Sequence, residues 1–154
     1  MTKRFDMNHI AKLALISGLM ALAPGLANAQ APRCLVLTGT YAFTFNGAAV
    51  FPGSPNPVPF NGVGISTFDG YGKWTATESA NFGAFVVRSV PFSGTYTLNP
   101  DCTGTATAKF PDGSTGRQDF VVADGGKVIY AIGVDQGPTG TWLATTFTKM
   151  PVTW

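Results

Sequence analysis

The sequence predicts an all-β protein that folds as an eight-stranded antiparallel up-and-down barrel. Short runs rich in Thr, Val and aromatic residues recur along the chain, and Gly- or Pro-containing turns separate them. A single open sheet of eight strands would expose two edges, so closure into a barrel is favoured. A two-sheet sandwich is the alternative, but its Greek-key crossings usually need longer connections than these turns provide.

Residues 1–29 precede the barrel and have the layout of a cleaved secretory signal. A positively charged start and a short apolar run, residues 13–22, lead to the small residues of 27–29. The run is too short to span a bilayer. A retained amphipathic anchor is the rival interpretation, and it lacks a polar face. We therefore expect an exported protein, periplasmic or extracellular, whose mature chain is one β-barrel domain over residues 30–154.

Eight strands are expected in the mature chain, each rich in β-forming residues and each ending at turn residues. Their expected ranges are 38–45, 60–68, 73–80, 86–98, 103–110, 118–123, 128–134 and 140–148. In the fourth strand, Pro91 indicates a bulge or an interrupted edge. Asp-Gly pairs at 69–70, 112–113 and 124–125 predict hairpin turns, because glycine readily adopts the positive φ that such turns need.

Two features concern the outside of the predicted barrel. The proline-rich residues 51–59 either cover one mouth of the barrel or form a stiff connection. Residues 128–132 are apolar on both faces, which suggests that another subunit covers the outer wall there. An outer-membrane barrel would also be apolar outside, but it needs strands of about nine to eleven residues. Most of the expected strands are shorter, so we expect no membrane insertion and a possible homo-oligomer.

The charge and histidine content excludes several classes of function. Seven basic and seven acidic residues remain once residues 1–29 are removed, with no basic cluster to attract nucleic acid. The only histidine, His9, lies in the signal. The mature chain therefore has no Ser-His-Asp or Cys-His arrangement and no histidine-based zinc site. We expect no cofactor and no metal, with a calcium ion bound partly by backbone carbonyls as the open alternative.

The two cysteines, Cys34 and Cys102, are expected to form a disulfide, because an exported chain meets an oxidising compartment. A loop of this length stabilises the fold by roughly 4 kcal/mol in the chain-entropy model. A reactive thiol is the alternative, but no histidine or cationic cluster would activate it.

Several turns and strand openings are distinctive. They are Gly39-Thr40-Tyr41, Phe68-Asp69-Gly70-Tyr71-Gly72, Gly94-Thr95-Tyr96 and Asn99-Pro100-Asp101-Cys102-Thr103-Gly104. Together they resemble a group of small exported bacterial barrels that is similar to the allene oxide cyclase-like barrels, which are relatives of the lipocalins in shape. The resemblance implies an interior that holds an apolar small molecule, and in some members a cyclase whose cavity constrains its substrate. The motifs specify fold more than chemistry, so no catalytic residue is carried over.

Glu78, the only glutamate, is the leading candidate for a functional group and the candidate catalytic residue. It shares the more apolar face of its strand with Trp74, which predicts that it points inward, where an isolated charge is costly. Arg88 lies directly opposite Glu78 if the connecting loop has three residues, and on the other face if it has two or four. Glu78 is then an acid or base, a polar contact for a ligand, one member of a structural ion pair, or a solvent-exposed charge at the rim of the barrel.

Aromatic residues supply the remaining candidate ligand contacts. Tyr41, Tyr96 and Tyr130 either offer hydroxyl donors to a cavity or pack their rings and direct the hydroxyl to the rim. Trp74 either lines a pocket or fills the core.

Three functions follow from these residues. The first is a barrel that binds an apolar small molecule, which an interior filled with side chains would exclude. The second is a cyclase or isomerase that acts by cavity shape, with Glu78 as acid or base. The third is a structural or surface-interaction protein whose apolar outer faces build an assembly.

Overall fold

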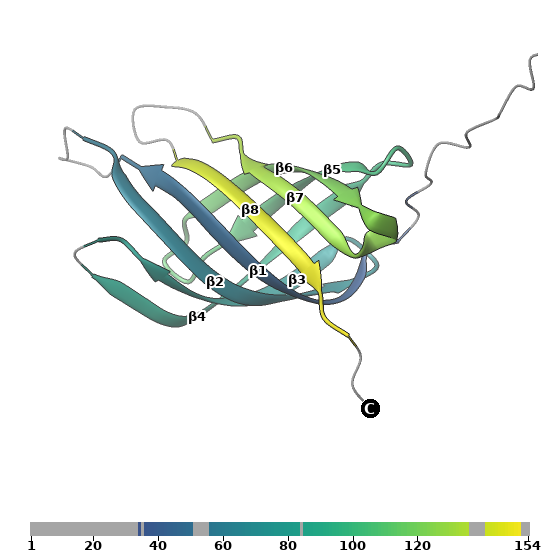
Figure 1. The fold of residues 1–154 in the computed structure, drawn as a ribbon, viewed down its shortest axis with the longest axis horizontal. Coiled ribbons are helices and arrows are strands. Elements are labelled where there is room, and N and C mark those ends of the chain that lie inside the picture. The colour runs from purple at the N-terminus through teal and green to yellow at the C-terminus, as the bar shows by residue number, and fades with distance from the viewer. Residues whose placement is uncertain (1–33, 35, 51–55, 84, 136–140, 152–154) are drawn as a thin grey trace, which may run out of the picture. The chain divides into compact units, whose positions relative to one another are not determined.

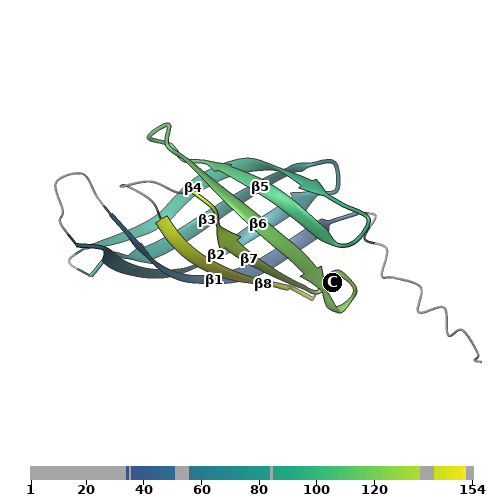
Figure 2. The same cartoon turned by 90° about the horizontal axis from the view of Figure 1, so that it is seen from above.

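The computed structural model describes residues 34, 36–50, 56–83, 85–135 and 141–151. In these residues eight strands form a closed antiparallel barrel (Figure 1). Each strand is hydrogen-bonded to the strands before and after it in the chain, and β8 closes the barrel by pairing with β1. A second view shows β5 and β6 side by side along the wall (Figure 2). The predicted fold class, an eight-stranded up-and-down barrel, is confirmed.

The strands agree with the predicted ranges to within a few residues. They are β1 (Thr38–Ala49), β2 (Val58–Asp69), β3 (Lys73–Asn81), β4 (Val86–Leu98), β5 (Thr103–Lys109), β6 (Thr115–Ala123), β7 (Val128–Gly133) and β8 (Thr141–Lys149). The largest differences are at the end of β1 and the start of β6. Gly47 resembles a loop residue in the sequence, yet it continues β1 because it pairs with Phe60 of β2. Of the proline-rich connection, residues 51–55 lie outside the described part of the chain.

The predicted Asp-Gly hairpin turns are confirmed. Gly70, Gly113 and Gly125 have φ angles of 85°, 87° and 62°, which a residue with a side chain adopts only at a cost. At the first turn, the Asp69 carboxylate accepts hydrogen bonds from the backbone N–H groups of Tyr71 (2.7 Å) and Lys73 (2.9 Å). These bonds hold the pKa of Asp69 below its usual value.

The irregularity in β4 lies at Ser89 instead of Pro91. Glu78 of β3 pairs with Val90, whereas Ala80 pairs with Val87, so β4 has an extra residue at this point. Ser89 has a φ of 53°, and its N–H donates to the Ser79 hydroxyl at 3.1 Å. Pro91 is paired with β3, but β5 begins to pair with β4 only at Ser93. Pro91 therefore occupies an edge, where the missing N–H of proline costs no ladder bond.

The inner face of the barrel is built largely from aromatic rings that lie over glycines. In four cross-strand pairs a ring occupies the space that a glycine opposite it leaves free. The pairs are Phe43–Gly64, Phe45–Gly62, Trp74–Gly94 and Phe120–Gly104. An eight-stranded barrel has little interior volume, so large side chains can point inward only where the facing residues are small.

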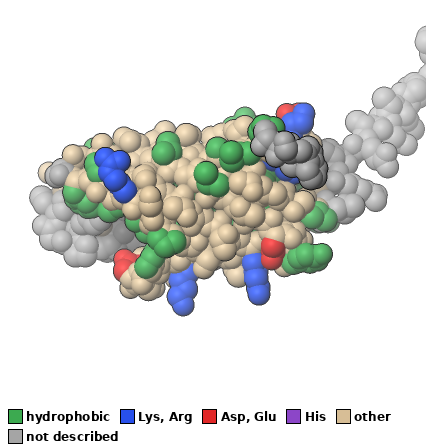
Figure 3. Space-filling model, turned by 90° about the horizontal axis from the view of Figure 1, so that it is seen from below, with side chains coloured by type: hydrophobic (Ala, Val, Ile, Leu, Met, Phe, Trp, Pro, Cys, Tyr) green, Lys and Arg blue, Asp and Glu red, His purple; other side chains and the backbone are tan. Residues whose placement is uncertain are grey.

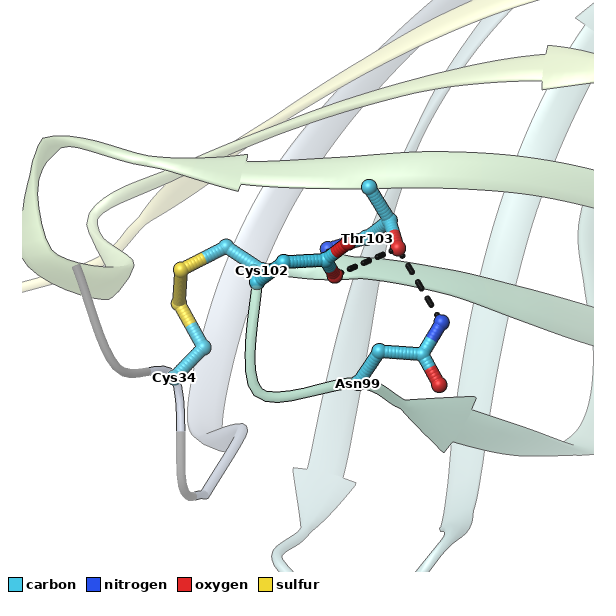
Figure 4. Close-up of a disulfide and its surroundings, with 5 residues drawn as sticks. Cys34, Asn99, Cys102 and Thr103 are labelled. Atoms are coloured by element: carbon cyan, nitrogen blue, oxygen red, sulfur yellow. Dashed lines mark hydrogen bonds between the residues drawn. A yellow bond between two sulfur atoms is a disulfide. The ribbon is translucent and has the colours of Figure 1, made fainter. Parts of the chain in front are cut away.

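One end of the barrel, here called the disulfide end, is where β2, β4, β6 and β8 finish. Cys34 and Cys102 form the predicted disulfide there (Figure 4). The Tyr96 hydroxyl donates to the Leu37 carbonyl oxygen at 2.7 Å, and the Leu37 side chain is buried in the core. The segment before β1 therefore closes this end. The opposite end, where β1, β3, β5 and β7 finish, is called the loop end.

Candidate functional site

Glu78 lies on the inner face of the barrel, as the alternation of β3 predicted. Its neighbours on the same face of β3 are the buried residues Ala76 and Ala80, and its cross-strand partners are Gly64 and Val90. The side chain is half-buried. Among the described residues, no hydrogen bond or ion pair to its carboxyl group is present. Within the described ranges, one carboxyl group thus lies without a partner on the largely apolar inner face.

The environment of Glu78 changes its acidity. Burial raises the pKa of the Glu78 carboxyl group to about 7, because the apolar surroundings disfavour the charged form. The group consequently changes its charge near neutral pH, which an ordinary exposed glutamate does not do.

Arg88 is not the partner of Glu78. Four residues separate the paired Asn81 and Val86, which is one of the loop lengths predicted to move Arg88 off the position opposite Glu78. The extra residue at Ser89 then places Val90 opposite Glu78, and Arg88 is exposed beside Ser89. The arrangement in which residues 78 and 88 lie directly opposite is therefore wrong for this register. Arg117 of β6 binds Asp135, with Nε and Oδ1 2.9 Å apart.

The tyrosines lie in three different settings. Tyr41 is fully buried, and its hydroxyl donates to the Gly126 carbonyl oxygen at 2.6 Å. Tyr96 bonds to Leu37 as described above. Both hydroxyl groups are thus used at the disulfide end. Tyr130 points outward and is 52% exposed, so the structure does not place it with the interior residues.

Trp74 is buried in the half of the interior nearer the disulfide end. Its ring contacts Phe68 and Phe92, with centroid separations of 6.0 and 5.3 Å. The space beside it, which Leu37 and Gln118 also line, has a volume of about 10 Å³. That volume is about the size of one water molecule. This half of the barrel is therefore largely filled with side chains, and the space beside Trp74 is too small for an organic ligand.

Three further polar side chains on the inner face were missed in the sequence. They are Ser66 on β2, Gln118 on β6 and Thr145 on β8. The Ser66 and Thr145 hydroxyl groups are buried and have no hydrogen-bond partner among the described residues. Strand alternation was the available signal, since Ser66 and Gln118 each lie two residues before an inward phenylalanine. Buried hydroxyl groups of this kind normally bond to water or a ligand.

The outer wall carries a larger but open groove of about 920 Å³. Thr67, Thr75 and Thr77 line it together with apolar residues that include Ile65 and Phe110. It is open to solvent and contains no carboxyl group, so it offers no enclosed environment for chemistry. A space-filling view shows one face of the barrel, with isolated apolar side chains among uncharged polar ones and few charged groups (Figure 3).

The described residues hold no cluster of three or more His, Cys, Asp or Glu side chains suited to a metal ion. None of the helical segments in the described ranges has the length and apolar character needed to cross a membrane.

Comparison with known proteins gives information on the fold alone. No family model matches the chain, and no curated protein does. Among solved structures, a redesigned β-barrel matches with a TM-score of 0.51 and 14% identity, over 75% of this chain and 92% of that one. A de novo designed fluorescence-activating β-barrel has a TM-score of 0.47 and 12% identity, over 73% of this chain and 93% of that one.

The similarity to the redesigned β-barrel supports the barrel architecture and no particular natural family. That structure is a redesigned barrel, so the family that the turn motifs resemble stays a prediction. At 14% identity the shared feature is the β-barrel fold, and a fold does not specify a function.

Proposed function

We propose that the protein binds a small apolar molecule in the half of the barrel interior nearer the loop end. The observation that carries this proposal is the inward, half-buried and unpaired carboxyl group of Glu78. A carboxyl group in an apolar interior is costly to the fold and is retained most readily where it contacts a ligand. Because the space beside Trp74 is too small for an organic ligand, we take the neighbourhood of Glu78 as the proposed site.

The walls around Glu78 support an apolar ligand. Phe43 and Phe45 lie over the glycines beside Glu78, and their centroids are 6.0 Å apart. Phe45 contacts Phe60 at 5.9 Å, which extends the aromatic wall toward the loop end. Aromatic walls with a few inward polar groups are typical of small-molecule sites in proteins.

Titration with the neutral apolar probe N-phenyl-1-naphthylamine tests this proposal, with backbone amide NMR shifts as the readout. We expect saturable shifts at Gly64, Glu78 and Val90, and none at Leu98 near the disulfide end. No saturable binding, or shifts confined to outward residues such as Tyr130, would overturn the proposal.

The proposed setting is an oxidising compartment outside the cytoplasm. The Cys34–Cys102 disulfide supports export, because such bonds persist where thiols are not kept reduced. N-terminal sequencing of the protein from its own host tests this directly. We expect a mature chain that begins at Gln30, and a chain that retains residues 1–29 would contradict export by a cleaved signal.

Proton transfer is the second candidate function, and the acidity of Glu78 favours it. A pKa of about 7 lets one group act both as acid and as base at neutral pH. The corresponding reaction is an isomerisation or cyclisation through proton transfer next to a carbonyl group. Its test is the isomerisation of a panel of β,γ-unsaturated ketones. We expect turnover that rises with pH through about 7 and is lost in Glu78→Gln, and equal rates in the variant would exclude this role.

A further inference from the structure

The described residues around Glu78 carry no positive charge. The inner faces of β2 and β4 present Gly64 and Val90 to it, and β1 presents Phe43 across Gly64. All the lysine and arginine residues of the described ranges are exposed. When Glu78 is ionised, the described chain therefore supplies no counter-ion inside the barrel.

A row of contacting aromatic rings runs from Phe45, which lies over the glycine opposite Ala80 on the same face as Glu78, toward the surface. Phe45 contacts Phe60 at 5.9 Å, Phe60 contacts Phe82 at 5.6 Å, and Phe82 stacks on Phe85 at 5.0 Å. Phe60 is buried, whereas Phe85 is 53% exposed. The faces of aromatic rings attract cations as well as apolar groups. These rings thus offer favourable contacts to a ligand that carries a positive charge on an apolar body.

We propose that the ligand of the loop-end site is an apolar cation, an amine or quaternary ammonium whose charge lies against the Glu78 carboxylate and whose body lies against Phe45 and Phe60. This inference rests on the proposed binding function and specifies the ligand class. The cation replaces the counter-ion that the interior lacks, and the aromatic walls accept the apolar body.

Binding of such a ligand depends on the ionisation of Glu78. No titratable group faces it from β1, β2 or β4, and Arg88 lies exposed beside the bulge. The other titratable groups on the inner face, Tyr41 and Tyr96, have pKa values that burial raises above the usual tyrosine value. With a pKa of about 7 for Glu78, the ionised fraction increases about tenfold between pH 6 and pH 8.

The test compares a quaternary ammonium with its neutral isostere. The probes are 4-phenylbutyltrimethylammonium and the hydrocarbon in which carbon replaces the nitrogen, titrated into the full-length protein by calorimetry at pH 6 and pH 8. The ammonium does not titrate, so any pH dependence belongs to the protein. The variants are Glu78→Gln and, as a matched control, Asp119→Asn, which removes one exposed negative charge from the outer face of β6.

We expect the wild-type protein to bind the cation at least tenfold more tightly than the isostere at pH 8. That preference should fall about tenfold at pH 6, disappear in Glu78→Gln and persist in Asp119→Asn. If both probes bind equally at pH 8, the cation inference is wrong and the binding function stands. If neither binds, both are wrong. If Glu78→Gln does not fold, the pH dependence of cation binding to the wild-type protein still tests the cation inference.

Discussion

Glu78 pairs with Val90 across the β3–β4 ladder, and Arg88 lies outside that pair. An isolated carboxyl group inside a barrel behaves differently from one that forms an ion pair with a neighbouring strand. Its charge is not neutralised by the protein, so it affects both the pH dependence of folding and the choice of ligand.

The stability of the protein should fall as the pH rises from about 5 to 8. Glu78 has a folded-state pKa of about 7, above the usual value of 4.5. Between these values the folded state binds the proton more tightly than the unfolded state, so raising the pH favours unfolding. The free energy of unfolding should decrease by at most about 3 kcal/mol. The decrease should be smaller than this limit because water still reaches the half-buried side chain.

Urea denaturation at pH 5 and pH 8 measures this effect. Glu78→Gln removes the titrating group and should abolish most of the difference between the two pH values. Three exposed carboxylates have lowered pKa values, and they are Asp69, Asp101 and Asp112. Their contribution to the free energy of unfolding is therefore lost only below this pH range. A wild-type protein that is as stable at pH 8 as at pH 5 would contradict the inward placement of an unpaired Glu78.

Reduction of the disulfide should destabilise the barrel strongly. Cys34 and Cys102 are 68 residues apart in the sequence. Loop closure over that distance stabilises by roughly 4 kcal/mol in the chain-entropy model. Thermal denaturation with and without reductant should show a large drop in the midpoint. The double variant Cys34→Ser with Cys102→Ser should already have the lower midpoint and show no response to reductant.

Adding a methyl group at Gly104 should destabilise the protein by about 2 kcal/mol, because overpacking forces rings and backbone to shift. A Cβ atom there would overlap the Phe120 ring and the Thr97 carbonyl oxygen. Gly116→Ala is the matched control, since its Cβ would meet Phe110 at an ordinary 3.7 Å. Chemical denaturation compares the two variants. Equal stability of Gly104→Ala and Gly116→Ala would show that the ring does not occupy the glycine space.

Loss of the Tyr41 hydroxyl should weaken the disulfide end. The hydroxyl group donates to the Gly126 carbonyl oxygen at 2.6 Å from a fully buried ring. Tyr41→Phe keeps the ring and leaves that carbonyl without this donor, which costs about 1–2 kcal/mol. The exposed Tyr130 provides the control, and Tyr130→Phe should change the free energy of unfolding by less than about 0.5 kcal/mol. Equal effects of the two substitutions would argue against the buried bond.

Local patterns in the sequence were sufficient to predict the strands, most turns and the side of β3 that Glu78 occupies. Asp-Gly pairs define hairpins because the backbone conformation they favour is local, and strand alternation assigns Glu78 to the face of Trp74. Two cysteines in a chain expected to be exported also predict one disulfide. None of these inferences needs a contact between distant residues to be known in advance.

Only the tertiary structure decided the partner of Glu78, the direction of Tyr130 and the filling of the disulfide end. The extra residue at Ser89 shifts the register of β4 without a distinctive sequence signal. Residues 128–132 are apolar on both faces, so alternation alone does not select the inner one. Leu37 closes the barrel from outside the strands. Each outcome depends on which distant segments fit together at close packing, and local sequence preferences do not contain that information.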